Sequence, residues 1–285
     1  MRALIGSAVL ALVATVATAG CDSLADGEVV VSLDTRASEQ AFADDWEVSF
    51  SRVLVSVGDL EIAKSDGEVG ARSAATYVVD LAQGAADIEL IESLTTERWD
   101  AVSFSTRPPG DGPVKAFGAG DDDVSMLREG GYSHWIEGAA SKGERTVTFA
   151  WGIAAPSTYT ACTLGAEMEP GLTVAKGGTT SLPLTFHRDH LFFDTLGLED
   201  GPLRFDAIAA VGDADGVVAW GALADQGLAA LQDENGEPLT DINGPVLYDT
   251  RDVVLAREDL QRFMLAGLEA AVHVGADGDC VAAPL

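Results

Sequence analysis

The sequence predicts a mainly β fold, in which an antiparallel β-sandwich is followed by a small helical portion. Apolar and polar residues alternate in many short segments of the first two thirds of the chain, and turn-forming residues separate these segments about every ten residues. Helical spacing of apolar residues is clear only after residue 190. Because 47% of the residues are hydrophobic, the chain can bury a core. Strands followed by helices are typical of a sandwich with a helical portion.

The predicted strands share period-two alternation or many β-branched residues. They cover 28–33, 46–62, 76–81, 102–104, 132–137, 144–151, 159–164 and 182–186, whereas the spacing over 87–94 fits either a strand or a helix. Segments 132–137 and 144–151 are joined by a small polar loop and form the clearest hairpin. Within 46–62 the apolar positions change parity between Phe50 and Val53. This change predicts a β-bulge or a strand that passes from one sheet to another.

Helical spacing predicts three helices near the C-terminus, over 202–210, 222–231 and 257–273. The sandwich is therefore expected to occupy 28–190 and the helical portion 191–285. The part that runs from Trp46 through Asp80 to Phe104 resembles the immunoglobulin-like sandwich domains of bacterial surface lipoproteins of unknown function. The resemblance implies an immunoglobulin-like sandwich.

The N-terminus has the layout of an export signal. Arg2 is followed by an apolar run over 3–17, then by small residues and Cys21. This arrangement resembles the signal of a bacterial lipoprotein. The resemblance implies that residues 1–20 are removed, that diacylglycerol is attached to the sulfur of Cys21, and that 21–27 forms a short tether. The protein is then expected in the cell envelope, anchored to a membrane through the lipid and facing the periplasm or the cell surface. An uncleaved membrane anchor is the alternative.

The chain has three cysteines, Cys21, Cys162 and Cys280. If Cys21 carries lipid, the other two remain, and exported compartments favour disulfides. We therefore predict a disulfide between Cys162 and Cys280 that ties the C-terminus to the middle of the chain, with two separate thiols as the alternative. On the loop-entropy model, so long a closure stabilises the fold by roughly 5 kcal/mol.

The chain is strongly acidic, with 46 acidic and 17 basic residues and a net charge of −29. Nucleic acids would be repelled by this charge, so they are excluded as partners. The acids are expected on the outside of the packed core. The partner that these features predict is an envelope ligand or protein, whose identity the composition leaves open.

The strongest candidate site is the segment 187–194, which holds two of the four histidines and two carboxylates. Imidazole and carboxylate together suit a transition metal such as zinc or copper. In a helical turn, the three-residue separation places His187 and His190 on one face, whereas in a continued strand they point to opposite faces. Asp189 or Asp194 would complete the metal site. The alternative is a strand-end turn whose histidines bond to backbone carbonyls or to neighbouring acids.

A second acidic segment resembles the loop of a calcium-binding EF-hand. Asp213, Asp215 and Gly216 match the third, fifth and sixth positions of that loop. Val211 stands at the first position and Ala222 at the twelfth, so two carboxylate ligands are missing. We interpret the segment as a helix–loop–helix that lacks its ion, with weak calcium binding as the alternative. Calcium is therefore not expected as a cofactor.

Two further features are weaker candidates. The acidic run 121–123 is expected at a solvated loop tip. Trp135 would contact a ligand if its face of the strand were exposed, and would otherwise be a core residue. Neither feature specifies a ligand.

The sequence contains no recognisable catalytic motif: the G-x-S-x-G elbow, the P-loop and the H-E-x-x-H motif are all missing. The chain is therefore predicted to be a membrane-tethered lipoprotein without a cofactor, with a non-catalytic binding or envelope-interaction role. The first alternative is a lipoprotein that binds or handles a metal through His187 and His190. The second is a hydrolase whose carboxylates the sequence does not identify.

Overall fold

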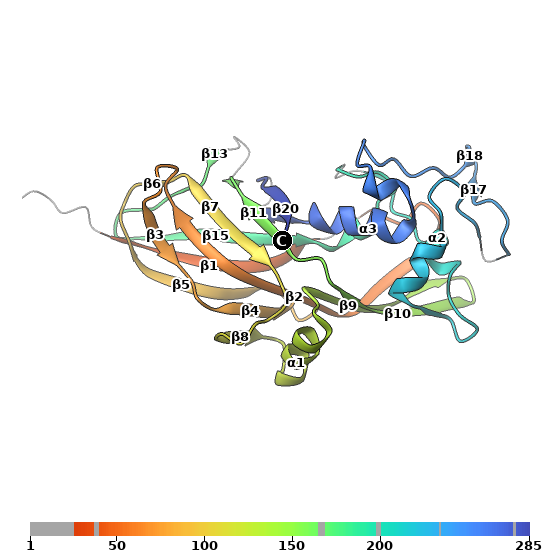
Figure 1. The fold of residues 1–285 in the computed structure, drawn as a ribbon, viewed down its shortest axis with the longest axis horizontal. Coiled ribbons are helices and arrows are strands. Elements are labelled where there is room, and N and C mark those ends of the chain that lie inside the picture. Colours follow the sequence, from red (N-terminus) through yellow and green to blue (C-terminus); the bar gives the residue numbers. More distant parts are fainter. Residues whose placement is uncertain (1–25, 37–39, 165–168, 198–200, 234, 276–277) are drawn as a thin grey trace, which may run out of the picture.

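The computed structural model describes residues 26–36, 40–164, 169–197, 201–233, 235–275 and 278–285, and Cys21 with the export signal lies outside these ranges. Two main β-sheets and several short helices form the fold (Figure 1). The expected mainly β fold is confirmed. Strands of both sheets contribute to one large hydrophobic core, as a sandwich requires.

The smaller sheet has four strands in the order β19-β15-β1-β5. Its members are β1 (Gly27–Arg36), β5 (Ala86–Leu94), β15 (Thr179–His187) and β19 (Val272–Val274). Alternate residues of β1, from Val29 to Leu33, are fully buried, so one face of this strand packs against the core. On β15, Phe186 faces the core, which places Thr185 and His187 on the outer face of the sheet.

The larger sheet has ten strands and is built around β2 (Glu47–Ala63). The strands that complete it are β3 (Val69–Arg72), β4 (Thr76–Asp80), β7 (Ala101–Thr106), β8 (Val114–Phe117), β9 (His134–Lys142), β10 (Arg145–Ile153), β11 (Ser157–Thr160), β16 (Val217–Val218) and β20 (Val281–Pro284). The pairing of β2 with β9 shifts register between Phe50 and Arg52, so the expected bulge is present. The predicted hairpin is the antiparallel pair of β9 and β10.

Neither main sheet is purely antiparallel, which corrects the expected antiparallel sandwich. β1 runs parallel to β15, β4 to β8, and β10 to β16. The remaining strands form three two-stranded pairs: β6 (Arg98–Trp99) with β14 (Leu172–Thr173), β12 (Thr163–Leu164) with β13 (Glu169–Pro170), and β17 (Thr240–Asp241) with β18 (Gly244–Pro245). The alternation of apolar residues marks a strand but carries no information on the direction of its neighbour, and for this reason the parallel pairs were not predicted.

The helical elements are shorter than the sequence patterns predicted. They are α1 (Asp121–Gly130), η1 (Arg188–Leu191), α2 (Asp206–Ala209), η2 (Trp220–Asp225), η3 (Leu255–Arg257) and α3 (Leu260–Glu269), where η denotes a 3₁₀ helix. Only α2 lies in the segment 202–210, and 222–231 contains just the end of η2. The segment 257–273 divides into the end of η3, α3 and the start of β19. Helical spacing indicates which side chains become buried, but tertiary packing decides how many turns form.

The acidic run 121–123 is not a loop tip, because it forms the first turn of α1. Negative side chains are favourable there, since the first N–H groups of a helix are unpaired and its dipole is positive at this end. The carboxylate of Asp123 accepts a hydrogen bond from the N–H of Gly120 at 2.9 Å and pairs with Arg52 at 3.0 Å. Val124 and Leu127 then pack α1 against the large sheet in a small second core.

The C-terminal portion contributes strands as well as helices to the fold. β19 belongs to the small sheet, and both β16 and β20 belong to the large one. The predicted disulfide between Cys162 and Cys280 is present and links positions 118 residues apart. Residues after 190 therefore complete both sheets and share their core.

His134 is an uncharged histidine in the core. It is almost fully buried, its ring stacks on Phe186 with centroids 5.7 Å apart, and its Nδ1 lies 2.9 Å from the hydroxyl oxygen of Ser133. Burial lowers the pKa of His134 to about 3. The folded protein thus keeps this ring neutral at pH values where an unfolded chain protonates it.

We expect His134 to make the fold sensitive to acid. The His134 ring of the unfolded state takes up a proton near pH 6.5, whereas the ring in the folded state does not. The free energy of unfolding therefore decreases as the pH drops below that value. Between pH 6.5 and about pH 5, the unfolding free energy of the wild type should fall by about 2 kcal/mol relative to that of His134→Gln. Urea unfolding at several pH values measures this difference, and a difference that does not change with pH would contradict the assignment.

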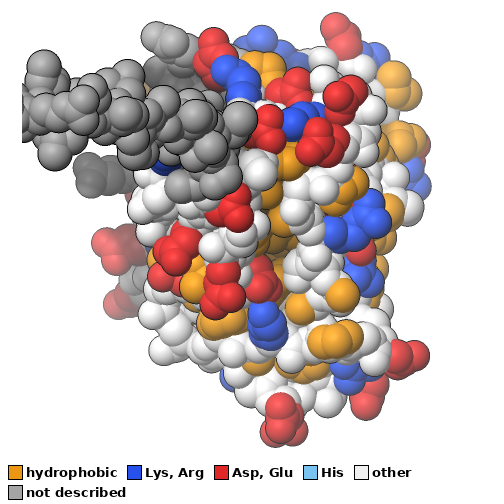
Figure 2. Space-filling model, turned by 90° about the vertical axis from the view of Figure 1, so that its left-hand side faces the viewer, with side chains coloured by type: hydrophobic (Ala, Val, Ile, Leu, Met, Phe, Trp, Pro, Cys, Tyr) orange, Lys and Arg blue, Asp and Glu red, His pale blue; other side chains and the backbone are white. Residues whose placement is uncertain are grey.

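Acidic and basic side chains are interspersed on the surface at one end of the molecule. Figure 2 shows this end, where Asp and Glu side chains alternate with Lys and Arg around a strip of hydrophobic side chains. Ion pairs join oppositely charged side chains of the surface; Lys64, for example, pairs with both Glu68 and Glu97.

Among the residues that the structure describes, none of the helices has the length and hydropathy of a membrane span.

Candidate metal centre

The candidate site begins where β15 ends. His187 is the last residue of β15, and η1 follows it directly. A 3₁₀ helix has about three residues per turn, so side chains at positions i and i+3 lie one above the other. The ring centroids of His187 and His190 are accordingly 5.0 Å apart. Of the two arrangements that the sequence allowed, the structure therefore has the turn, in which both histidines share a face.

Helix α3 holds His190 from the other side. Gly267 of α3 lies so close to η1 that a Cβ in its place would be 2.7 Å from the carbonyl oxygen of His190. The Nδ1 of His190 lies 3.1 Å from the carbonyl oxygen of Ala270, just after the end of α3. Because a carbonyl only accepts hydrogen bonds, Nδ1 carries the proton and the lone pair is on Nε2.

Strand β19 brings a third histidine to the same face. His273 is paired with Thr185 in the antiparallel register of β15 and β19, so its side chain lies on the outer face beside His187. Its ring centroid is 4.9 Å from that of His187 and 5.7 Å from that of His190. Its Nδ1 donates to the carbonyl oxygen of Gly278 at 3.0 Å, and its buried Nε2 has no hydrogen-bond partner among the described residues.

A carboxylate completes the group. Asp189 is buried in η1, and each of Asp189, His187 and His190 has a ligand atom within 4.8 Å of those of the other two. Asp34 of β1 lies on the same outer face, in register with Thr185. His187, His190 and Asp189 thus bring their ligand atoms together on the outer side of the small sheet, and the ring of His273 packs beside them.

Burial keeps His190 neutral. Desolvation lowers the pKa of His190 to about 3, and the electrostatic effects of the neighbouring His187 and His273 act in the same direction. The hydrogen bond to Ala270 raises that pKa, but it is the weaker effect. A neutral imidazole whose Nδ1–H is bound to a carbonyl presents the Nε2 lone pair, which is the form that a metal ligand requires.

Asp194 does not join this group, contrary to the expectation for the segment 187–194. Its carboxylate accepts hydrogen bonds from Nε of Arg204 at 2.7 Å and from the hydroxyl of Thr195 at 3.0 Å. The same guanidinium donates to Asp241 at 2.9 Å. Asp194 is therefore part of a separate polar network, in which Arg204 neutralises its charge.

The segment that resembles an EF-hand loop forms a turn stabilised by its own acid. The carboxylate of Asp213 accepts hydrogen bonds from the backbone N–H groups of Asp215 at 3.0 Å and Val217 at 2.8 Å. Gly216 adopts a φ of 75°, which allows the chain to turn into β16. The loop keeps the turn that was expected of it, and the lack of a bound ion, with weak calcium binding as the alternative, stays a prediction.

Trp135 lies partly buried beneath α1 and does not stand on an open face. It packs against the small second core, and its ring centroid is 6.0 Å from that of Tyr132. Its Nε1 lies 3.4 Å from a carboxylate oxygen of Glu137. These contacts account for the side chain without a ligand.

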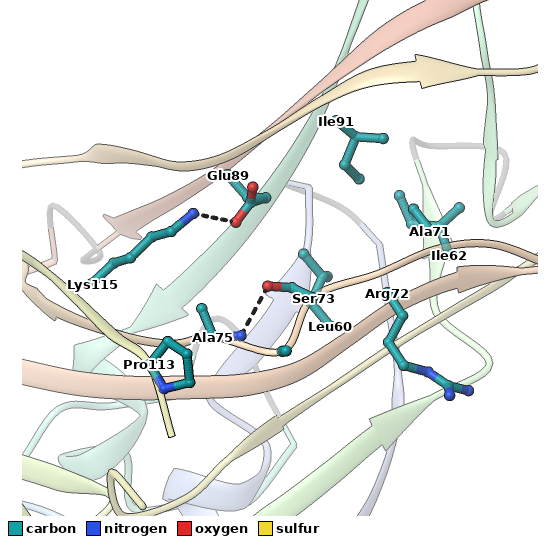
Figure 3. A pocket seen from close by; sticks show the side chains of 11 residues that line it. Leu60, Ile62, Ala71, Arg72, Ser73, Ala75, Glu89, Ile91, Pro113 and Lys115 are labelled. Atoms are coloured by element: carbon teal, nitrogen blue, oxygen red, sulfur yellow. Dashed lines mark hydrogen bonds and ion pairs between the residues drawn. The ribbon is translucent and has the colours of Figure 1, made fainter. Parts of the chain in front are cut away.

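A cavity of about 320 Å³ lies between β3, β5 and β8 (Figure 3). Its wall is largely apolar, with Leu60 and Ile91 among the lining residues. Lys115 points across the cavity to Glu89, and their charged atoms are 2.7 Å apart. Arg72 also lines it and is paired with Glu61. Both cations of this cavity are therefore already neutralised by acids of the chain.

His273 is the member of the site that sequence reasoning missed. The helical pattern over 257–273 placed it at the end of a helix, where it had no link to the segment 187–194. One signal was present, because His273 lies seven residues before Cys280, whose disulfide returns this part of the chain to the sheets. The strand pairing that brings His273 to β15 cannot be recognised from local spacing.

Comparison with known proteins gives no family for this chain: no protein-family model matches it, and no curated protein or solved structure is significantly similar. The resemblance to immunoglobulin-like domains and to a lipoprotein signal stays a prediction. The geometry of the chain's own residues is therefore the basis for assigning a function.

Proposed function

We propose that the protein binds a transition-metal ion through His187, His190, His273 and Asp189. The observation that carries this proposal is the convergence of three of the four histidines from separate parts of the sequence. β15 and η1 supply two of them, and β19 supplies the third. Clustered imidazoles disfavour one another's charged form, and neutral imidazoles are the form that binds a metal ion.

The donor set favours particular metals. Imidazole nitrogen with carboxylate oxygen suits zinc, copper(II) and nickel, whereas calcium and magnesium prefer sites made of oxygen atoms. Cys162 and Cys280 are joined in the disulfide, so they supply no thiolate to the site. Among divalent first-row ions, the general order of affinity places copper highest, above both nickel and zinc.

The surroundings support metal binding over a purely structural role. His190 and His273 each donate Nδ1–H to a backbone carbonyl, which orients the ring and leaves the lone pair on Nε2 as the ligand atom. In a structural cluster, the buried Nε2 of His273 would remain without a partner at a cost of about 1–3 kcal/mol. A bound ion would satisfy this nitrogen.

The proposal agrees with the location that the sequence predicts. A lipid on Cys21 would hold the domain at a membrane of the cell envelope, where it would bind a metal ion outside the cytoplasm. The role is binding or handling of the ion, and no reaction is assigned to it. Metal binding is a specific form of the binding role in the cell envelope that the sequence predicts, with a transition-metal ion as the ligand.

The direct test is a zinc and copper titration of protein purified without a histidine tag and stripped of metal with a chelator. We expect one ion per chain and a rise in melting temperature when it binds. The double variant His187→Ala/His190→Ala should lose at least about a hundredfold in affinity, because loss of an outer-shell partner alone costs roughly 10–100-fold.

The matched control is His134→Gln, which removes the one histidine that lies outside the cluster. This variant should bind the metal with the affinity of the wild type. Equal affinity of the double variant and the wild type would exclude the site, as would a wild type that fails to bind either ion.

A further inference from the structure

We propose that a second cavity, beside η1, is a binding site for a small aromatic carboxylate, with Arg188 as the group that recognises the anion. The cavity has a volume of about 360 Å³ and is lined by residues before and within β2 and by η1. It is large enough for a single aromatic ring with its substituents. The proposal is independent of metal binding at the histidines.

The wall of this cavity is aromatic. Four rings line it, those of Phe42, Trp46, Phe50 and Phe192. The ring of Phe192 lies 5.6 Å from that of Phe42 and 6.0 Å from that of Phe50, between centroids. Trp46 is held in place because its Nε1 donates to Asp206 at 2.7 Å. Such a wall offers faces and edges to another aromatic ring without a rearrangement of the chain.

Arg188 is the cation of this cavity, and it differs from most arginines of the protein. In the described ranges, eight other arginines pair with a carboxylate, whereas Arg188 does not. Its guanidinium carbon lies 4.9 Å from the ring centroid of Phe50, and its Nε is buried with no hydrogen-bond partner among the residues described. An unsatisfied guanidinium in a chain of net charge −29 is well suited to bind an anion.

The acids near this cavity do not neutralise Arg188. Asp189 lines the cavity, but a carboxylate oxygen of it lies within 4.8 Å of a ligand atom of His187 and of His190. Glu47 lines the cavity but is exposed to solvent and makes no ion pair with Arg188. A carboxylate that enters the cavity can therefore accept hydrogen bonds from the planar guanidinium while its ring lies among the aromatic side chains.

The cavity between β3, β5 and β8 shows why an arginine without an ion pair matters for anion binding. There Lys115 and Arg72 are already paired with Glu89 and Glu61, so a carboxylate would have to displace an acid of the chain. In the cavity beside η1, none of the acids that the structure describes forms an ion pair with Arg188. Charge complementarity thus distinguishes two cavities of similar volume.

The test uses benzoate as the probe and isotope-labelled, metal-free protein. We expect saturable shifts of the NMR signals of the Arg188 Nε–H and the Trp46 Nε1–H, with a dissociation constant in the millimolar range that suits so small a ligand. Benzyl alcohol, which has the ring but not the charge, should bind about tenfold more weakly. Benzylammonium should bind no better than the alcohol.

Arg188→Gln should weaken benzoate binding by about tenfold, and Arg188→Lys should recover only part of it, because an ammonium lacks the planar fork. Arg72→Gln, which removes the paired arginine of the first cavity, is the matched control and should bind like the wild type. The proposal fails if benzoate causes no saturable shift of the two signals, or if the wild type binds benzoate and benzyl alcohol equally. The affinities of the wild type for benzoate and benzyl alcohol test the proposal even if a variant does not fold.

Discussion

Replacement of His273 by alanine should lower the affinity for zinc by about a hundredfold or more, although His273 lies far from the segment 187–194 in the sequence. The reason is geometric. The Nε2 of His273 is buried, and its ring lies beside those of His187 and His190, with ring centroids at 4.9 and 5.7 Å. Removing it takes away one of four proposed ligands, and zinc favours four in a closed site. Competition titration with a zinc chelator measures the change.

The stability of His273→Ala should be measured together with its affinity. The variant loses the hydrogen bond to Gly278, which should cost about 1 kcal/mol of unfolding free energy. A large loss of affinity with this small loss of stability would identify His273 as a ligand. Unchanged affinity would show that the centre consists of His187, His190 and Asp189 alone.

Removal of the disulfide should have the largest effect on stability. The bond closes a loop between positions 118 residues apart, and on the loop-entropy model such a closure contributes about 5 kcal/mol. The double variant Cys162→Ala/Cys280→Ala should therefore unfold at a clearly lower urea concentration. It serves better than chemical reduction, because free thiols would themselves bind zinc.

The same variant should also weaken metal binding. The backbone N–H of Thr163 donates to Asp279 at 2.8 Å, so the disulfide and this bond together hold the segment that contains Gly278. Gly278 in turn accepts the hydrogen bond that orients His273. We expect a fall in affinity of about tenfold, smaller than that of His273→Ala.

A suitable control for the disulfide variant is wild-type protein that has been reduced and then reoxidised before any metal is added, which should have the stability and affinity of the untreated wild type. An unfolding free energy equal to that of the wild type would contradict the predicted contribution of the bond. A loss of stability with no loss of affinity would show that His273 keeps its orientation without the disulfide.

The strands were predictable because their signal is local. Alternation from Val29 to Leu33 marks β1, and the change of parity after Phe50 marks the bulge in β2. Each needs only a few neighbouring residues, since successive side chains of a strand point to opposite faces. The helices were predicted less well, because their lengths depend on packing. α1 was missed altogether, since only Val124 and Leu127 of it are buried and its acids indicated a loop.

By itself, the sequence determined the mainly β class and the pairing of Cys162 with Cys280, and it predicted candidate metal ligands in the segment 187–194. The tertiary structure alone decided that the chain turns after His187, that Asp194 pairs with Arg204, and that β19 carries His273 to the site. The physical reason is that period and composition report the environment of each residue along one strand. Which strands become neighbours depends on contacts between residues far apart in the chain, and a metal centre needs those contacts.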